Sequence, residues 1–136
     1  MKSKPNSKVV LSIENFKATT TSRGVKYPID TAKEKGGSGT GPTPVEYFLA
    51  AIGGCVAITL RTYADQMKWN LGEITVHVTE DTKLTPKGIV KTILEEIKVE
   101  NEVSEEPLEL LKERAKSCPV AQMVNGETEI KRTIKN

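Results

Sequence analysis

The stretch Gly41–Cys55, GPTPVEYFLAAIGGC, decides the fold of this chain. Thr43 can cap a helix and Pro44 suits the first helical position, so a helix begins here. Strong helix formers then follow as far as Trp69. Because residues 47–60 are apolar or small on every face, we expect the rest of the domain to wrap around this helix.

The segments that flank this helix have the periodicity of β-strands, with a few turns and two further helices. We expect Gly-rich residues 33–44 to form a loop, and Pro28, which cannot donate a ladder hydrogen bond, to lie at a sheet edge or at a strand end. The second helix turns Leu108, Leu110, Leu111 and Ala115 inward behind a cap at Ser104, and Pro119 opens the third. We expect strands at residues 9–13, 16–21, 25–29, 73–79, 90–99 and 128–134, and helices at 105–117 and 120–124. The order predicts an α+β fold with two mainly antiparallel sheets around the buried helix.

Length and composition limit the classes to which the protein can belong. The 136 residues suit one domain, 1–136, with a single core. The first eight residues lack the apolar stretch of a secretory signal, and the longest apolar run is shorter than a membrane span, so we expect a cytoplasmic protein that does not enter a membrane. Aromatic residues make up 4% and no run of five like charges occurs, so a nucleic-acid surface is not expected.

The two cysteines, Cys55 and Cys118, are the chain's best candidates for chemistry. Cys55 lies inside the apolar run, where a thiol is by default an inert small hydrophobe. Cys118 occupies the N-cap of the short helix, where the dipole favours the thiolate and lowers the thiol pKa. His77 is the only histidine and alternates with apolar residues in a strand, so we expect neither a metal site nor a Cys–His pair.

The GPTPVEYFLAAIGGC stretch, followed by Cys118-Pro119-Val120, resembles the two cysteine motifs of the OsmC/Ohr family of peroxide-reducing proteins. The resemblance covers nearly the whole chain. It implies an intertwined homodimer with two active sites at the subunit interface.

The resemblance also implies a thiol peroxidase without metal or organic cofactor, active in defence against oxidative stress. Cys55 would attack the peroxide and become a sulfenic acid, and Cys118 would resolve it as a disulfide. An external thiol or dithiol, such as a lipoyl group, would reduce that disulfide. In the family an arginine of the N-terminal strand region activates the attacking cysteine, and Arg23 matches that position. Phe48, Ile52 and Val56 could line a pocket for an alkyl hydroperoxide.

One position departs from the family pattern. The family places a glutamate directly after the helix-opening proline to hold the arginine, whereas this chain has Val45 there and Glu46 next to it. Glu46 is the substitute candidate, although nine residues separate it from Cys55 and place the two on opposite sides of the helix. The alternatives are therefore a non-enzymatic module that senses oxidant or binds a thiol ligand, and a structural domain with two inert cysteines.

Overall fold

The computed structural model describes residues 4–13 and 16–136 of the chain. Residues 1–3, at the start of the segment in which no secretory signal is expected, lie outside the described residues. The chain divides into two compact units, residues 1–48 and 49–136, and the boundary falls in the second turn of a long helix. The prediction of a single domain stays a prediction.

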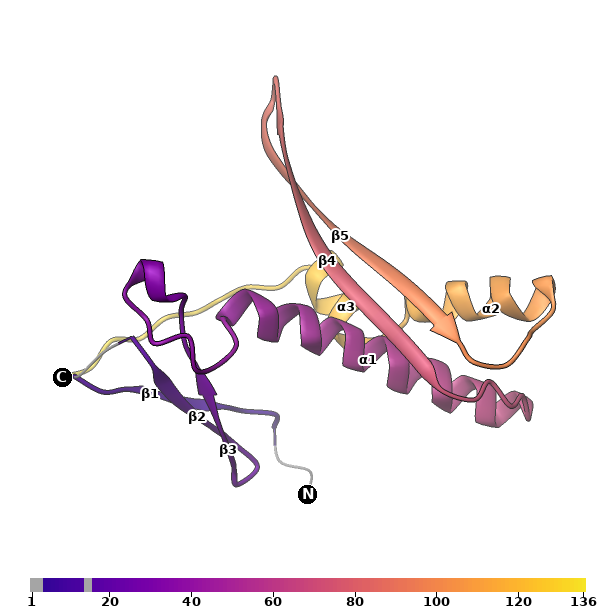
Figure 1. Cartoon of the computed structure of the whole chain (residues 1–136), viewed down its shortest axis with the longest axis horizontal. Helices are drawn as coiled ribbons and strands as arrows, with labels where there is room; N and C mark the ends of the chain where they lie inside the picture. Colours follow the sequence, from indigo (N-terminus) through magenta and orange to yellow (C-terminus); the bar gives the residue numbers. More distant parts are fainter. Residues whose placement is uncertain (1–3, 14–15) are drawn as a thin grey trace. The chain divides into compact units, whose positions relative to one another are not determined.

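The first unit contains a three-stranded antiparallel sheet in the order β1-β2-β3 (Figure 1). Its strands are β1 (Lys8–Leu11), β2 (Ala18–Ser22) and β3 (Val25–Ile29), close to the expected ranges. The turn between β2 and β3 places Arg23 and Gly24 at positive φ, 51° and 78°, as tight two-residue hairpin turns require. Pro28 lies on the edge strand β3, as predicted. All four residues of the other edge strand, β1, are exposed.

The long helix α1 (Pro44–Met67) begins with the predicted cap. The Glu46 backbone N–H donates to Thr43 Oγ1 at 3.2 Å, and the Thr43 backbone N–H donates to Glu46 Oε1 at 2.9 Å. This reciprocal pair is a capping box, which satisfies two backbone donors at the helix end.

In the second unit, the hairpin of β4 (Ile74–Thr85) and β5 (Gly88–Val99) packs against α1 (Figure 1). A stripe of α1 is buried beneath it: Ile52, Gly53, Val56, Leu60 and Ala64. A Cβ added to Gly53 would lie 3.1 Å from Val78 Cγ2, so β4 can cross the helix closely only because this residue has no side chain.

The prediction that α1 is wrapped on every face is wrong for a single chain. Phe48 is 45% and Ile58 70% exposed, and an added Cβ at Gly54 would meet no atom within 4 Å. One hairpin and two short helices cover only one side of a helix, which leaves its other apolar side chains in solvent. By length and composition alone α1 could also cross a membrane, with a mean hydropathy of 1.3 over 18 residues. Of that 18-residue window 22% is buried, in the stripe that packs against the rest of the second unit.

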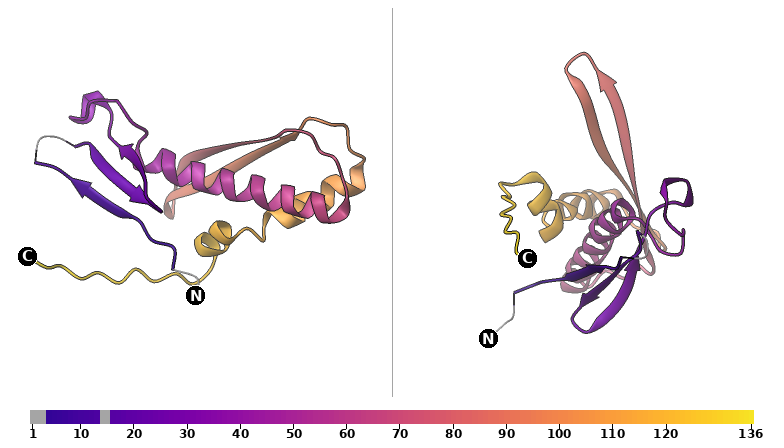
Figure 2. Two further views of the ribbon diagram at one scale, coloured as in Figure 1. Left: turned by 90° about the horizontal axis from the view of Figure 1, so that it is seen from below. Right: turned by 90° about the vertical axis from the view of Figure 1, so that its left-hand side faces the viewer.

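Two shorter helices complete the second unit (Figure 2). Helix α2 (Glu105–Ala115) buries Leu111 and Ala115, but Leu108 and Leu110 are 45% and 39% exposed, contrary to the prediction, and neither belongs to the core cluster around α1. Ser104 occupies its N-cap position without a side-chain hydrogen bond. Helix α3 (Pro119–Asn125) follows as predicted.

The prediction of a last strand at residues 128–134 is wrong. These residues run as an extended chain without strand pairing among the described residues (Figure 2). Ile130 and Ile134 are 70% and 95% exposed. The segment has the alternation of a strand, but it pairs with neither of the two sheets, and alternation alone does not supply the neighbour that a strand needs.

Candidate functional site

The second unit brings together Cys55 and Cys118, the two cysteines that the family resemblance pairs. Cys55 lies on α1 one turn after Ile52, and Cys118 is the N-cap residue of α3. Both are free thiols, and the Cys118 thiol interacts directly with that of Cys55. They differ in exposure, since Cys118 has no exposed surface and Cys55 is half-buried. Cys55 is therefore the more accessible of the two residues.

The pKa of the Cys118 thiol is raised, which corrects the prediction that its helix position lowers it. Burial has the largest effect because it penalises the thiolate, and the interaction with Cys55 raises the pKa further. The Ala121 backbone N–H donates to Cys118 Sγ at 3.3 Å and acts in the opposite direction, together with the Val120 N–H. The helix terminus does act on this thiol, but desolvation is the stronger effect.

A cavity of about 350 Å³ is lined by residues of both cysteine-bearing helices, although neither cysteine lines it. Its lining includes Ile52, which lies one turn before Cys55 on α1, and Ala121, whose backbone N–H donates to Cys118 Sγ. Of the residues expected to line a pocket, Ile52 does so, whereas Val56 is fully buried in the core. The full lining is Ile52, Lys91, Thr92, Ile93, Glu95, Ala121, Val124 and Asn125.

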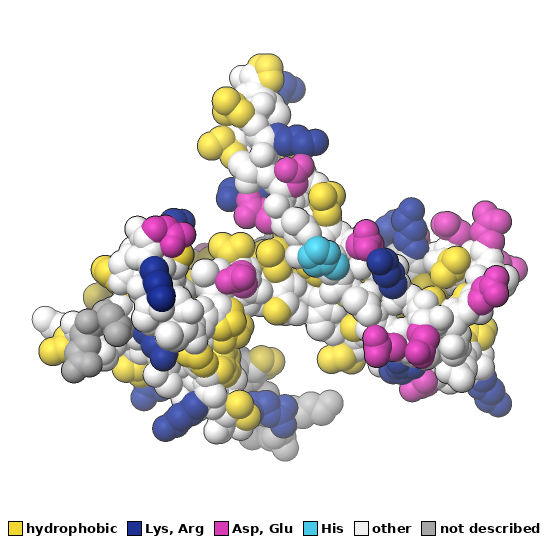
Figure 3. Space-filling view, viewed as in Figure 1, with side chains coloured by type: hydrophobic (Ala, Val, Ile, Leu, Met, Phe, Trp, Pro, Cys, Tyr) yellow, Lys and Arg dark blue, Asp and Glu magenta, His cyan; other side chains and the backbone are white. Residues whose placement is uncertain are grey.

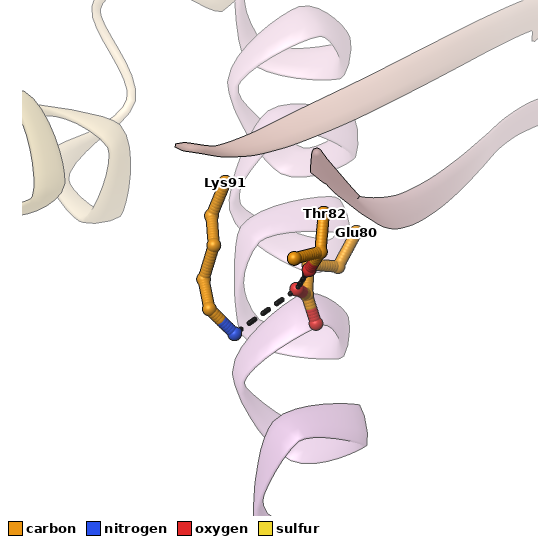
Figure 4. Close-up of polar contacts among 3 residues, drawn as sticks. All are labelled: Glu80, Thr82 and Lys91. Atoms are coloured by element: carbon orange, nitrogen blue, oxygen red, sulfur yellow. Dashed lines mark hydrogen bonds and ion pairs between the residues drawn. The ribbon is translucent and has the colours of Figure 1, made fainter. Parts of the chain in front are cut away.

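Charged groups border this cavity on the side of the hairpin. Lys91 Nζ lies 3.2 Å from Glu80 Oε1 across the two strands, and the Thr82 hydroxyl donates to the same carboxylate oxygen (Figure 4). These contacts lower the pKa of Glu80. Glu95 also lines the cavity and has no ion pair among the described residues. The cavity thus combines apolar walls with two charged residues: Lys91, which is paired with Glu80, and Glu95, which forms no ion pair among the described residues.

Arg23 lies in the first unit, at the exposed tip of the β2–β3 turn. It forms no ion pair with a carboxylate of the described residues. Its role toward Cys55 stays a prediction.

Glu46 is held in the capping box of α1. Its carboxylate accepts the Thr43 N–H, and this hydrogen bond, followed by that with the Thr43 hydroxyl, lowers the pKa of Glu46. The side chain is therefore engaged at the helix start, which is the structural role that a first-turn glutamate usually has.

Sequence reasoning missed Asp30, which is 1% exposed and organises the Gly-rich loop. Its carboxylate accepts hydrogen bonds from the Thr31, Ser38 and Thr40 backbone N–H groups and from the Ser38 and Thr40 hydroxyls. The hydrogen bond from the Ser38 hydroxyl has the largest effect on its pKa, which lies well below the usual range. An aspartate followed by several Ser, Thr and Gly residues could have indicated such a loop anchor.

A metal site has no support among residues 4–13 and 16–136. No group of three or more His, Cys, Asp or Glu side chains converges there. His77 lies on β4 and is exposed, as the strand alternation predicted.

Comparison with known proteins identifies the family. The sequence profile described as OsmC-like protein matches residues 37–133. No curated protein matches this sequence.

Solved structures share the fold at low sequence identity. An OsmC-like protein from Mycoplasma pneumoniae superposes with a TM-score of 0.70 and 21% identity, covering 93% of this chain and 90% of that one. The organic hydroperoxide resistance protein OsmC from Legionella pneumophila gives a TM-score of 0.68 and 21% identity over 91% and 90% of the two chains. The organic hydroperoxide resistance protein OhrB of Bacillus subtilis gives a TM-score of 0.64 and 19% identity over 90% and 91%. These likenesses confirm the predicted α+β fold with its two antiparallel sheets.

Proposed function

The chain belongs to the family of OsmC-like proteins, and from this premise we propose that it is a thiol peroxidase that reduces organic hydroperoxides or hydrogen peroxide. The observation that carries the proposal is the contact between a half-buried thiol and a fully buried one in the second unit. Two structural neighbours, from Legionella pneumophila and Bacillus subtilis, are named organic hydroperoxide resistance proteins.

The proposed reaction has two steps on the protein. Cys55 attacks the peroxide O–O bond and becomes a sulfenic acid, and the alcohol or water leaves with the second oxygen. The Cys118 thiol then attacks the Cys55 sulfur, which forms the disulfide and releases water. The half-exposed Cys55 is the thiol that a peroxide can reach, and Cys118 is close enough to follow.

The reaction needs no metal or organic cofactor in this scheme. A cation is needed instead, because a half-buried thiol attacks as its thiolate, and Arg23 is the residue that we propose for this role. An external thiol or dithiol, such as a lipoyl group, then reduces the disulfide. We place the reaction in the cytoplasm, as the sequence predicts.

We also propose that the protein works as a homodimer. Each chain leaves apolar side chains exposed on β1, on α1 and on the projecting end of the β4–β5 hairpin (Figure 3). Ile58 is 70%, Leu84 85% and Ile89 68% exposed. Such surface is typical of an interface. Sedimentation equilibrium should give twice the 14.9 kDa chain mass, and a monomer at micromolar concentration would contradict the dimer.

The test of activity is peroxide consumption by the purified protein with a dithiol reductant. Cumene hydroperoxide and hydrogen peroxide are assayed in parallel, with Cys55→Ser as the inactive control. Turnover that disappears in the variant supports the peroxidase. A folded protein without turnover would contradict it.

A second candidate is a module that senses oxidant or binds a thiol ligand without turnover. The favouring observation is that Val45 replaces the family's glutamate while the carboxylate of Glu46 is engaged with Thr43. An arginine without that anchor would activate Cys55 less. In this case oxidant would form the disulfide once, and added dithiol would not sustain peroxide consumption.

A further inference from the structure

We propose that an external thiol reduces the Cys55–Cys118 disulfide by attacking Sγ of Cys55 and releasing Cys118. The inference rests on the proposed function for its biological use. Its chemistry depends only on the two thiols and their surroundings.

Access to the two sulfurs differs in the reduced protein. Cys118 has no exposed surface and belongs to the same core cluster as Leu111 and Ala115 of the preceding helix. Cys55 is half-buried, and the 350 Å³ cavity begins one helical turn away at Ile52. Thiol–disulfide exchange requires the incoming sulfur to reach the attacked sulfur directly, and its rate depends on this access. The surroundings of Cys118 leave no such approach.

The surroundings of Cys118 also suit a departing sulfur. The exchange is written Cys55–S–S–Cys118 + R–SH → Cys55–S–S–R + Cys118–SH, so one S–S bond breaks, another forms, and the proton of the attacking thiol ends on Cys118. The released sulfur has a hydrogen-bond donor in place, since the Ala121 N–H lies 3.3 Å from Cys118 Sγ.

Burial of Cys118 has two opposite effects on this exchange. It raises the pKa of the thiol, and a leaving thiol of high pKa departs more slowly. The same raised pKa keeps the released Cys118 protonated near neutral pH, so that it attacks the new mixed disulfide slowly. The second thiol of a dithiol then has time to complete the reduction at Cys55.

The experiment identifies the sulfur that carries the reductant. The disulfide is formed with diamide, without peroxide, and is then treated briefly with limiting 2-mercaptoethanol. After acid quenching, freed thiols are labelled with N-ethylmaleimide and the tryptic peptides of Cys55 and Cys118 are quantified by mass spectrometry. The same treatment in guanidinium chloride, where both sulfurs are accessible, is the matched control.

We expect mercaptoethanol on Cys55 and maleimide on Cys118, with at least about a ten-fold excess over the reverse pattern in the native protein. In guanidinium chloride the excess should fall to about two-fold or less. Mercaptoethanol on Cys118, or equal amounts on both, would overturn the inference, and so would failure of diamide to form the disulfide. Because no peroxide is used, the result is readable even if the protein shows no peroxidase turnover.

Discussion

The difference in exposure between the two thiols predicts that alkylation of the native, reduced protein stops at one thiol per chain. Cys118 can react only after a local opening that exposes the thiol and breaks its hydrogen bond from Ala121. Burial of a small apolar group and one hydrogen bond together contribute about 2 to 3 kcal/mol. An opening of that size slows a reaction roughly 30- to 150-fold.

Thiolate content acts in the same direction. Burial raises the pKa of the Cys118 thiol, so its thiolate content at pH 7 is lower than that of an ordinary thiol. We therefore expect Cys55 to react with iodoacetamide at least about 30-fold faster than Cys118.

The assay follows both tryptic cysteine peptides by mass spectrometry over a time course at pH 7. The variants Cys55→Ser and Cys118→Ser identify each reaction independently, and guanidinium chloride should make the two rates similar. Equal rates in the native protein, or faster reaction of Cys118, would refute the reasoning from burial.

Four further predictions follow from single contacts. Formation of the disulfide after a peroxide pulse should accelerate up to about ten-fold per pH unit between pH 6 and 8, because the raised pKa of Cys118 limits its thiolate. Stopped-flow measurement of thiol loss at constant peroxide gives this rate, and a rate that does not change with pH would contradict the prediction. Thr43→Ala should lower the free energy of unfolding by about 1 kcal/mol and Thr43→Ser by much less, as measured by urea titration. Leu60→Ala should cost about 2 to 5 kcal/mol because Leu60 is fully buried, against less than about 1.5 kcal/mol for Leu60→Met. Asp30→Asn should lower the melting temperature at pH 7, and the difference should shrink as the pH falls below about 4, because a depressed carboxyl pKa stabilises only the ionised state.

The local structure of this chain could be predicted from its sequence because local interactions determine it. Thr43 and Pro44 start α1 where helix capping places it, and Pro119 starts α3 with Cys118 at its N-cap. The alternation of residues 74–79 and 90–99 is that of the observed hairpin. In the candidate site, Cys55 and Cys118 were candidates because they are the two cysteines of this chain, whereas their pairing was implied by the family resemblance and not by composition or helix position.

The wrong or missing predictions concern features that depend on packing between segments far apart in the sequence. Residues 128–134 alternate like a strand, but a strand also needs backbone hydrogen bonds with a neighbour, and neither sheet of the described residues pairs with this segment. Likewise, the apolar residues of α1 were expected inside, whereas one hairpin covers one stripe. Asp30 was missed because its role as a loop anchor depends on hydrogen bonds with residues up to ten positions later, and these form only when the loop has folded.

The pKa of Cys118 shows why a motif alone does not determine reactivity. The sequence places this thiol at a helix N-terminus, where backbone N–H groups favour the thiolate, and the structure contains that hydrogen bond. The same helix start is packed into the core, and removal of the thiol from water outweighs one weak N–H···S contact. A buried thiol with a raised pKa is poorly suited to meet peroxide first, but it suits a partner that acts after Cys55 has been oxidised. The order of the two cysteines in the proposed reaction thus follows from desolvation and exposure, and exchanging their environments should exchange their roles.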